Sequence, residues 1–163
     1  MKYIHVLGLF FCGFLLNAQA QTPTSAPDAP VPQAILGAKT AFVSNAMPII
    51  SNLSGGPTRG YNQFYADVKA MGRYELVDDP SKADIVFELQ AVPFDSIRTG
   101  LEGVRLVIYD RRTHYILWTL VHPTGSCALK KGCDRNFDAA MDSLIRDLKA
   151  LCRQSPSPTT PER

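Results

Sequence analysis

The sequence predicts an α+β domain, a two-layer α/β sandwich in which two helices cover one face of a mixed, mostly antiparallel sheet of about five strands. Three observations support this. Five short segments are rich in β-branched and aromatic residues, two longer segments repeat apolar residues at helical spacing, and the order is strand, helix, four strands, helix. The chain of 163 residues is 45% hydrophobic and 20% charged, the composition of one ordinary globular domain.

The predicted strands span residues 40–44, 73–77, 85–89, 104–109 and 115–121. The second and third are separated by a turn-forming Asp-Asp-Pro-Ser segment. In residues 85–89 every second residue is apolar, so one face of that strand is fully apolar. The last two segments are joined by residues 110–113, and we expect them to form a hairpin near the middle of the sheet.

The first predicted helix spans residues 61–71, where Tyr61, Phe64, Val68 and Met71 fall on one helical face. Gly72 follows and is a typical helix stop. The second helix spans about 136–151 and should pack on the sheet through a continuous apolar stripe of Phe137, Met141, Leu144, Ile145, Leu148 and Leu151.

Both ends of the chain differ from the domain between them. Residues 1–20 carry one lysine, an apolar stretch and a final Ala-Gln-Ala, which is typical of a secretory signal peptide cleaved after Ala20. The apolar stretch is too short to span a bilayer, although an uncleaved anchoring helix remains the alternative. We expect a Pro-rich linker over 21–33, a single domain over 34–153 and a disordered tail rich in Pro, Ser and Thr over 154–163. The protein is therefore expected to be exported, either periplasmic or secreted, with no transmembrane segment after cleavage.

Export permits disulfides. Cleavage leaves Cys127, Cys133 and Cys152, and a short loop separates the first two, which favours a Cys127–Cys133 disulfide with Cys152 as a free thiol. Pairing of Cys152 with either loop cysteine is the alternative. A zinc site of Cys127, Cys133 and His122 would lack a fourth ligand and known spacing, so we expect no metal and no cofactor.

Charge is unevenly distributed along the chain. The net charge is +2, which gives no basis for nucleic-acid binding, but residues 61–95 are predominantly acidic and residues 98–135 predominantly basic. The candidate binding residues form a basic edge that could meet a lipid head group, a cell-wall polymer or an acidic protein surface: Arg111, Arg112, Lys130 and Lys131.

Candidate catalytic groups are sparse. Asp78, Asp79 and Asp84 are close in sequence, but they are typical turn residues and lack the spacing of a calcium loop. His114 with Asp110 is the pair that a small hydrolase could use, and His122 lies at the far end of the same predicted strand. No Gly-x-Ser-x-Gly nucleophile motif accompanies them, so no catalytic residue is assigned.

Three features occur together: a strand ending in acidic residues over 73–79, an Ala83-Asp84 dipeptide opening the next strand, and an Asp-x-x-Thr turn at 110–113 before Leu117-Trp118. This pattern resembles small exported bacterial envelope domains, namely the amino-terminal domain of TolB, CsgG, LpoB and uncharacterised acidobacterial exported proteins. The resemblance implies an α/β domain with a non-catalytic role in binding or assembly at the envelope. Unlike the lipoprotein members, this sequence has no cysteine at the cleavage site.

The sequence therefore predicts an exported, non-catalytic binding or assembly module of the bacterial cell envelope, whose partner is an envelope protein or an anionic cell-wall or lipid surface. The alternative is a small exported hydrolase that uses a His/Asp pair.

Overall fold

The computed structural model describes residues 29–47, 53–56, 58–93 and 101–154. The predicted signal peptide lies outside these residues, as do residues 21–28 of the predicted linker and residues 155–163 of the predicted tail. Among the described residues, no helix combines the length and apolar character needed to cross a membrane.

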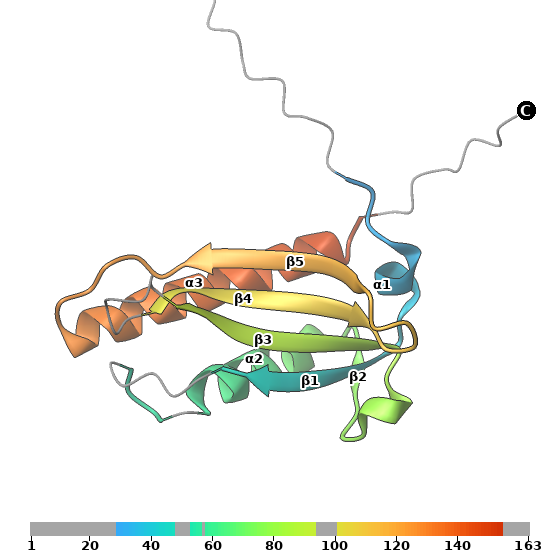
Figure 1. Ribbon diagram of the computed structural model, residues 1–163, viewed down its shortest axis with the longest axis horizontal. Helices are drawn as coiled ribbons and strands as arrows, with labels where there is room; N and C mark the ends of the chain where they lie inside the picture. The colour runs from blue at the N-terminus through green and yellow to red at the C-terminus, as the bar shows by residue number, and fades with distance from the viewer. Residues whose placement is uncertain (1–28, 48–52, 57, 94–100, 155–163) are drawn as a thin grey trace, which may run out of the picture.

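Five strands form one mixed sheet in the order β2-β1-β3-β4-β5 (Figure 1). Their bounds are β1 Thr40–Ala46, β2 Glu75–Leu76, β3 Ile85–Pro93, β4 Leu101–Asp110 and β5 Ile116–Pro123. Strand β1 pairs in parallel with both β2 and β3, whereas β3, β4 and β5 form an antiparallel meander with the longer ladders. The predicted α+β class and five-stranded sheet are confirmed.

One expectation about the sheet was wrong. The β4–β5 hairpin forms as predicted, but it does not lie near the middle, because β5 is an edge strand. The next element along the chain is the helix α3, which returns across the sheet and does not pair with it (Figure 1).

Two long helices, α2 Arg59–Met71 and α3 Lys130–Leu151, cover one face of the sheet (Figure 1). Helix α2 ends at Gly72, whose left-handed backbone (φ 63°) favours glycine. Two short elements complete the fold: the helix α1 Gln33–Gly37 and the 3-10 turn η1 Pro80–Lys82.

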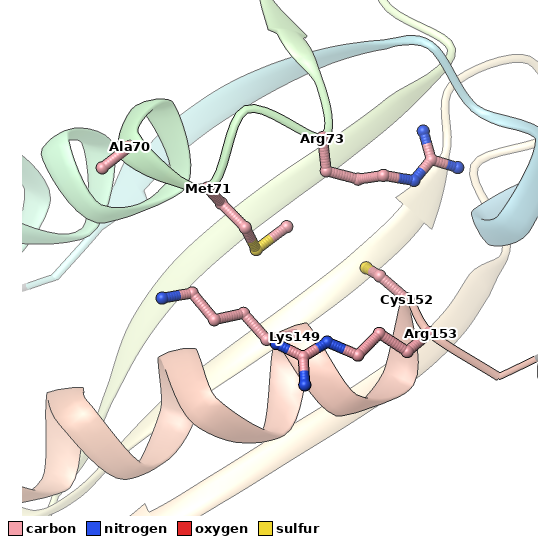
Figure 2. A pocket seen from close by; sticks show the side chains of 6 residues that line it. All are labelled: Ala70, Met71, Arg73, Lys149, Cys152 and Arg153. Atoms are coloured by element: carbon pink, nitrogen blue, oxygen red, sulfur yellow. The ribbon is translucent and has the colours of Figure 1, made fainter.

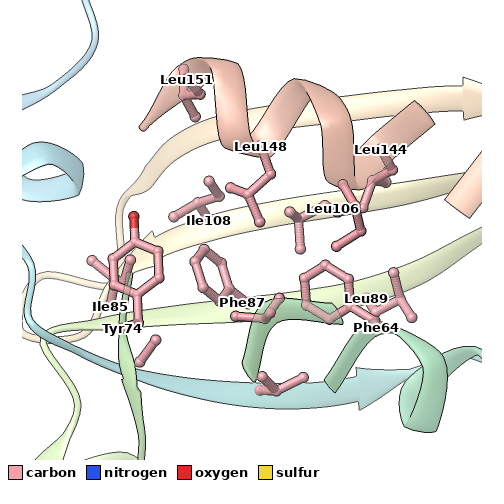
Figure 3. Close-up of a cluster of buried hydrophobic side chains, with 14 of the residues drawn as sticks. Phe64, Tyr74, Ile85, Phe87, Leu89, Leu106, Ile108, Leu144, Leu148 and Leu151 are labelled. Atoms are coloured by element: carbon pink, nitrogen blue, oxygen red, sulfur yellow. The ribbon is translucent and has the colours of Figure 1, made fainter. Parts of the chain in front are cut away.

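The core lies between the helices and the sheet (Figure 3). Phe87 of β3 is at its centre, fully buried, with edge-to-face ring contacts to Phe64 of α2 and to Tyr74, which precedes β2. The core also extends toward the N-terminus, where Val31 and Ile35 are buried. The packed part of the chain thus includes residues just before and within α1.

The opposite face of the sheet is turned toward the viewer in Figure 1, and no described helix covers it. It is amphipathic: Val86 is half-buried there, and the Tyr109 hydroxyl and the Gln90 amide both donate to the Glu88 carboxylate. Strand β5 carries a bulge in its ladder with β4, because Leu117 is the extra residue between two consecutive pairs.

Candidate functional site

The edge strand β5 and the residue before it expose three large hydrophobic side chains. Tyr115 is 74% exposed, Ile116 60% and Val121 50%. Within the described chain no strand pairs with the outer side of β5, so one row of its backbone N–H and C=O groups is available for pairing. An edge of this kind can accept an added strand from another chain.

The four residues of the candidate basic edge occupy two places. Arg111 and Arg112 lie in the turn between β4 and β5, whereas Lys130 and Lys131 begin α3 beyond the other end of β5 (Figure 1). The structure therefore brings the two arginines together and the two lysines together, and it does not join the pairs into one patch.

The turn that carries Arg111 and Arg112 borders a pocket. This pocket of about 350 Å³ lies beside α1 and the start of β1, with Arg112 and Lys39 facing Asp84 and Asp110. Its charges are balanced between the two cations and the two carboxylates. Backbone hydrogen bonds lower the pKa of both carboxyl groups, and the charge of Arg112 lowers each pKa further.

Two of the three aspartates at 78–84 accept hydrogen bonds from backbone amides. The Asp79 carboxylate accepts a hydrogen bond from the Ser81 amide at the start of η1, and hydrogen bonding to Ser81, through its side chain and its backbone, lowers the Asp79 pKa. Asp84 instead accepts from the amides at the start of β1, and those bonds lower its pKa as well. Across the described residues, no group of three His, Cys, Asp or Glu side chains could hold a metal ion.

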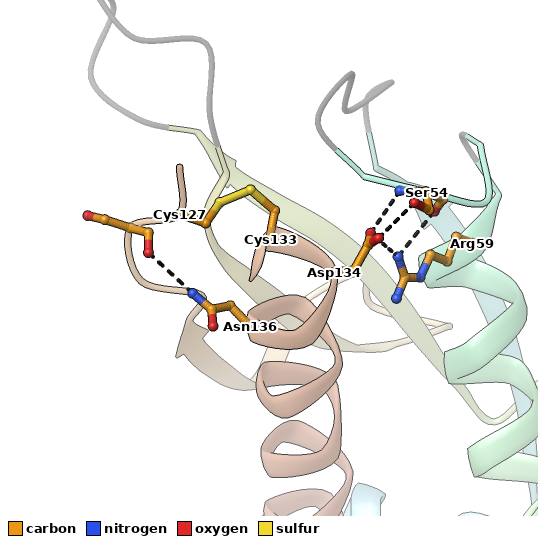
Figure 4. Close-up of a disulfide and its surroundings, with 7 residues drawn as sticks. Ser54, Arg59, Cys127, Cys133, Asp134 and Asn136 are labelled. Carbon is orange, nitrogen blue, oxygen red and sulfur yellow. Dashed lines mark hydrogen bonds and ion pairs between the residues drawn. A yellow bond between two sulfur atoms is a disulfide. The ribbon is translucent and has the colours of Figure 1, made fainter. Parts of the chain in front are cut away.

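The other end of the sheet carries the disulfide (Figure 4). Cys127 is bonded to Cys133 in the first turn of α3, with the two Cα atoms 5.1 Å apart. The two cysteines of the candidate zinc site are therefore bonded to each other, and neither has a free thiol to bind a metal. The third candidate ligand, His122, has its Nε2 atom 3.0 Å from a carboxylate oxygen of Asp147. Cys152 is a free thiol in the structure.

Directly after the disulfide, Asp134 connects α3 to the loop before α2 (Figure 4). Its carboxylate accepts hydrogen bonds from the Ser54 amide and hydroxyl, which, with an ion pair to Arg59, lower its pKa to about 2. Arg59 also pairs with Asp138 at 2.6 Å and lies over the Phe137 ring. The contacts of Arg59 with Asp134 and Asp138 were not predicted from the sequence. The one sequence feature that indicates them is the i, i+4 spacing of the two aspartates, which places both on one face of a helix.

The two candidate histidines have different surroundings, because His114 lies in the β4–β5 turn and His122 lies near the end of β5. The Asp110 carboxylate is occupied by the Thr113 amide and hydroxyl, and the His114 amide bonds to the Asp110 backbone carbonyl. His122 has a carboxylate partner in Asp147, but within the described residues no serine hydroxyl is hydrogen-bonded to its imidazole.

No family model and no curated protein matches the chain. Among solved structures, a DUF4136 family protein from Bacteroides thetaiotaomicron matches with a TM-score of 0.50 and 10% identity, over 73% of this chain and 91% of that one. The chain resembles it in fold. Two structures of the PelC dodecamer from Paraburkholderia phytofirmans, the second of them a point variant, are 16% and 14% identical. They cover 77% and 71% of this chain and 96% and 89% of their own, with TM-scores of 0.45 and 0.47.

Proposed function

We propose that this chain is an exported, non-catalytic binding or assembly module of the bacterial cell envelope, and that its contact surface is the edge strand β5 with the uncovered sheet face beside it. The observation that carries the proposal is the exposure of Tyr115, Ile116 and Val121 along an unpaired strand. Exposed hydrophobic residues on such an edge are a cost to an isolated soluble protein, and covering them with a partner removes that cost.

The arrangement suits strand addition. Backbone hydrogen bonds from β5 would supply affinity, and the exposed side chains on the uncovered face of the strand would supply selectivity. Arg111 and Arg112 precede the strand and the Lys130–Lys131 pair follows it, so both ends favour an acidic partner, whether an envelope protein or an anionic cell-wall or lipid surface.

Location at the envelope rests on the sequence. The predicted signal peptide, the disulfide between Cys127 and Cys133, and the resemblance of residues 73–89 and 110–118 to small envelope domains all support export. The intact mass of the protein from its native host, taken without reductant, tests this. We expect the mass of residues 21–163 less two hydrogens; a full-length mass with free thiols would contradict export.

Photo-crosslinking in the native host tests the contact surface. A photoreactive residue at Ile116 or Val121 should give a discrete crosslinked product with an envelope component or a second copy of the chain. The matched control is the same residue at Arg146, which is exposed on α3. Equal crosslinking yields at the β5 positions and at position 146, or no crosslinked product from the β5 positions, would refute β5 as the contact surface.

The basic residues need a separate test. Arg111→Gln with Arg112→Gln should weaken retention on envelope material at low salt, because fewer cations then face the anionic surface. Arg135→Gln with Arg146→Gln removes the same charge from α3 and serves as the control. Retention that is unchanged in the turn variant would remove these arginines from the contact.

A further inference from the structure

A pocket of about 350 Å³ opens between the C-terminal ends of α2 and α3, away from β5 (Figure 2). Half of its lining residues are cationic and none carries a carboxylate: Ala70, Met71, Arg73, Lys149, Cys152 and Arg153. The three cations come from two separate parts of the chain, the α2–β2 connection and the end of α3. Their mutual repulsion is unfavourable in the empty pocket, and an anion would relieve it.

Arg73 is already held in place. One guanidinium nitrogen donates to the Ala38 carbonyl at 2.9 Å, another donates to the Leu36 carbonyl, and the group lies 4.9 Å from the centre of the Tyr74 ring. A ligand that binds here therefore does not have to pay for ordering this side chain. Because both terminal nitrogens already donate to backbone carbonyls, Arg73 contributes a fixed positive charge to the pocket wall.

Lys149 and Arg153 complete the cationic side. No ion pair of either residue is found in the part of the chain that the structure describes. Burial and the nearby Asp142 raise the pKa of Asp67 on α2, and Lys149 is close enough to offset part of this rise. Lysine and arginine at a helix C-terminus complement the helix dipole, but that role does not account for Arg73, which lies beyond α2 and lines the same pocket.

We propose that this pocket binds the phosphate group of a small ligand. Lys149 and Arg153 match the two negative charges of a phosphate monoester, and their long side chains can turn toward it. Arg73 adds positive charge to the wall of the pocket from its fixed position. Ala70 and Met71 add an apolar wall for the rest of the ligand. The volume is at the small end of the range for ligand sites, which suits a phosphate ester or a lipid head group.

Cys152 provides a reporter inside the site, since its thiol lines the pocket (Figure 2). The full chain is alkylated with iodoacetamide without reductant, and the peptide that carries Cys152 is followed by mass spectrometry. Inorganic phosphate at about twice its dissociation constant should slow alkylation about threefold, because only the empty pocket reacts. Sodium chloride at the same ionic strength should not.

A pair of matched variants separates the pocket from general charge. Lys149→Gln with Arg153→Gln should weaken phosphate protection roughly tenfold, since each partly exposed ion pair contributes up to about fivefold. Arg135→Gln with Arg146→Gln removes two exposed cations from α3 outside the pocket and should leave protection unchanged.

The wild-type comparison stands even if a variant fails to fold. A slowing by phosphate that chloride reproduces, or an equal loss of protection in both variants, would overturn the proposal. Vesicles of phosphatidic acid, compared with phosphatidylcholine, identify the source of the phosphate. Protection by these vesicles without protection by dissolved phosphate assigns a lipid head group, and protection by dissolved phosphate assigns a soluble ester. Protection by neither would also overturn the proposal.

Discussion

Asp84 and Thr40 hold each other across the parallel pair of β1 and β3. The Thr40 amide donates to the Asp84 carboxylate at 3.0 Å, and the Asp84 amide donates to the Thr40 hydroxyl at 2.9 Å. The same carboxylate accepts from the Lys39 amide at 2.8 Å. The Ala83-Asp84 dipeptide that contributes to the family resemblance thus has a structural role, since it fixes where the two parallel strands begin.

Replacing Asp84 with alanine should lower the free energy of unfolding by about 1–2 kcal/mol, because two strand amides lose a charged acceptor. Chemical denaturation measures the change. Asp78→Ala is the control, because Asp78 is exposed in the same acidic segment; its effect should stay within about 0.5 kcal/mol. Similar losses in both variants would contradict the role of Asp84.

The Asp134 carboxylate should make the stability of the folded protein fall as the pH is lowered through the acidic range. Because its pKa is lowered to about 2 in the folded protein, its contribution is present above about pH 4 and is lost as the pH falls toward 2. The unfolding temperature of Asp134→Asn should therefore lie below that of the wild type at pH 7 and approach it near pH 2. Asp78→Asn, at an exposed position outside α3, should not show this convergence. A gap between wild type and Asp134→Asn that stays constant down to pH 2 would contradict the prediction.

The two faces of β3 should respond differently to truncation. Phe87→Ala removes a fully buried ring and its two aromatic contacts, so we expect a loss of about 3–5 kcal/mol in the free energy of unfolding. Val86→Ala, one residue away on the uncovered face, should cost roughly 1 kcal/mol or less because Val86 is only half-buried. Urea titrations of both variants compare them, and equal costs would mean that the uncovered face is packed as tightly as the core.

The disulfide should stabilise one end of the molecule. Cys127→Ala with Cys133→Ala should lower the free energy of unfolding by about 2 kcal/mol, the value for so short a loop in the chain-entropy model. Hydrogen exchange should accelerate at residues 127–135 and at Ser54, which bonds to the neighbouring Asp134. The β4–β5 turn is the internal control, and faster exchange there would show that the disulfide acts on the whole fold.

The sequence was sufficient for the parts of the fold that rest on periodicity. Alternating apolar residues located β3, and the 3–4 spacing located α2 with its glycine stop. Helix α3 begins at Lys130, six residues before the predicted start. The segment around Cys133, which we expected to be a loop, forms the first turns of α3. Its residues are mostly polar, so it lacks the apolar spacing from which the rest of the helix was predicted.

Other features depend on tertiary contacts that a local pattern does not contain. Helix α1 has five residues and follows a proline-rich segment, and it is held by the burial of Ile35. The position of β5 at the edge depends on the path that α3 takes, and the separation of the arginine and lysine pairs follows from the length of the strand between them. The Arg59–Asp134 contact joins residues 75 positions apart.

The extra residue at Leu117 limits how an added strand can grow along this protein. A chain that pairs with β5 in register over residues 118–123 reaches the bulge and cannot continue in the same register past Leu117. The available template is therefore one short run, which permits the capture of a brief extended segment. It opposes the long, uninterrupted ladders from which fibrils grow.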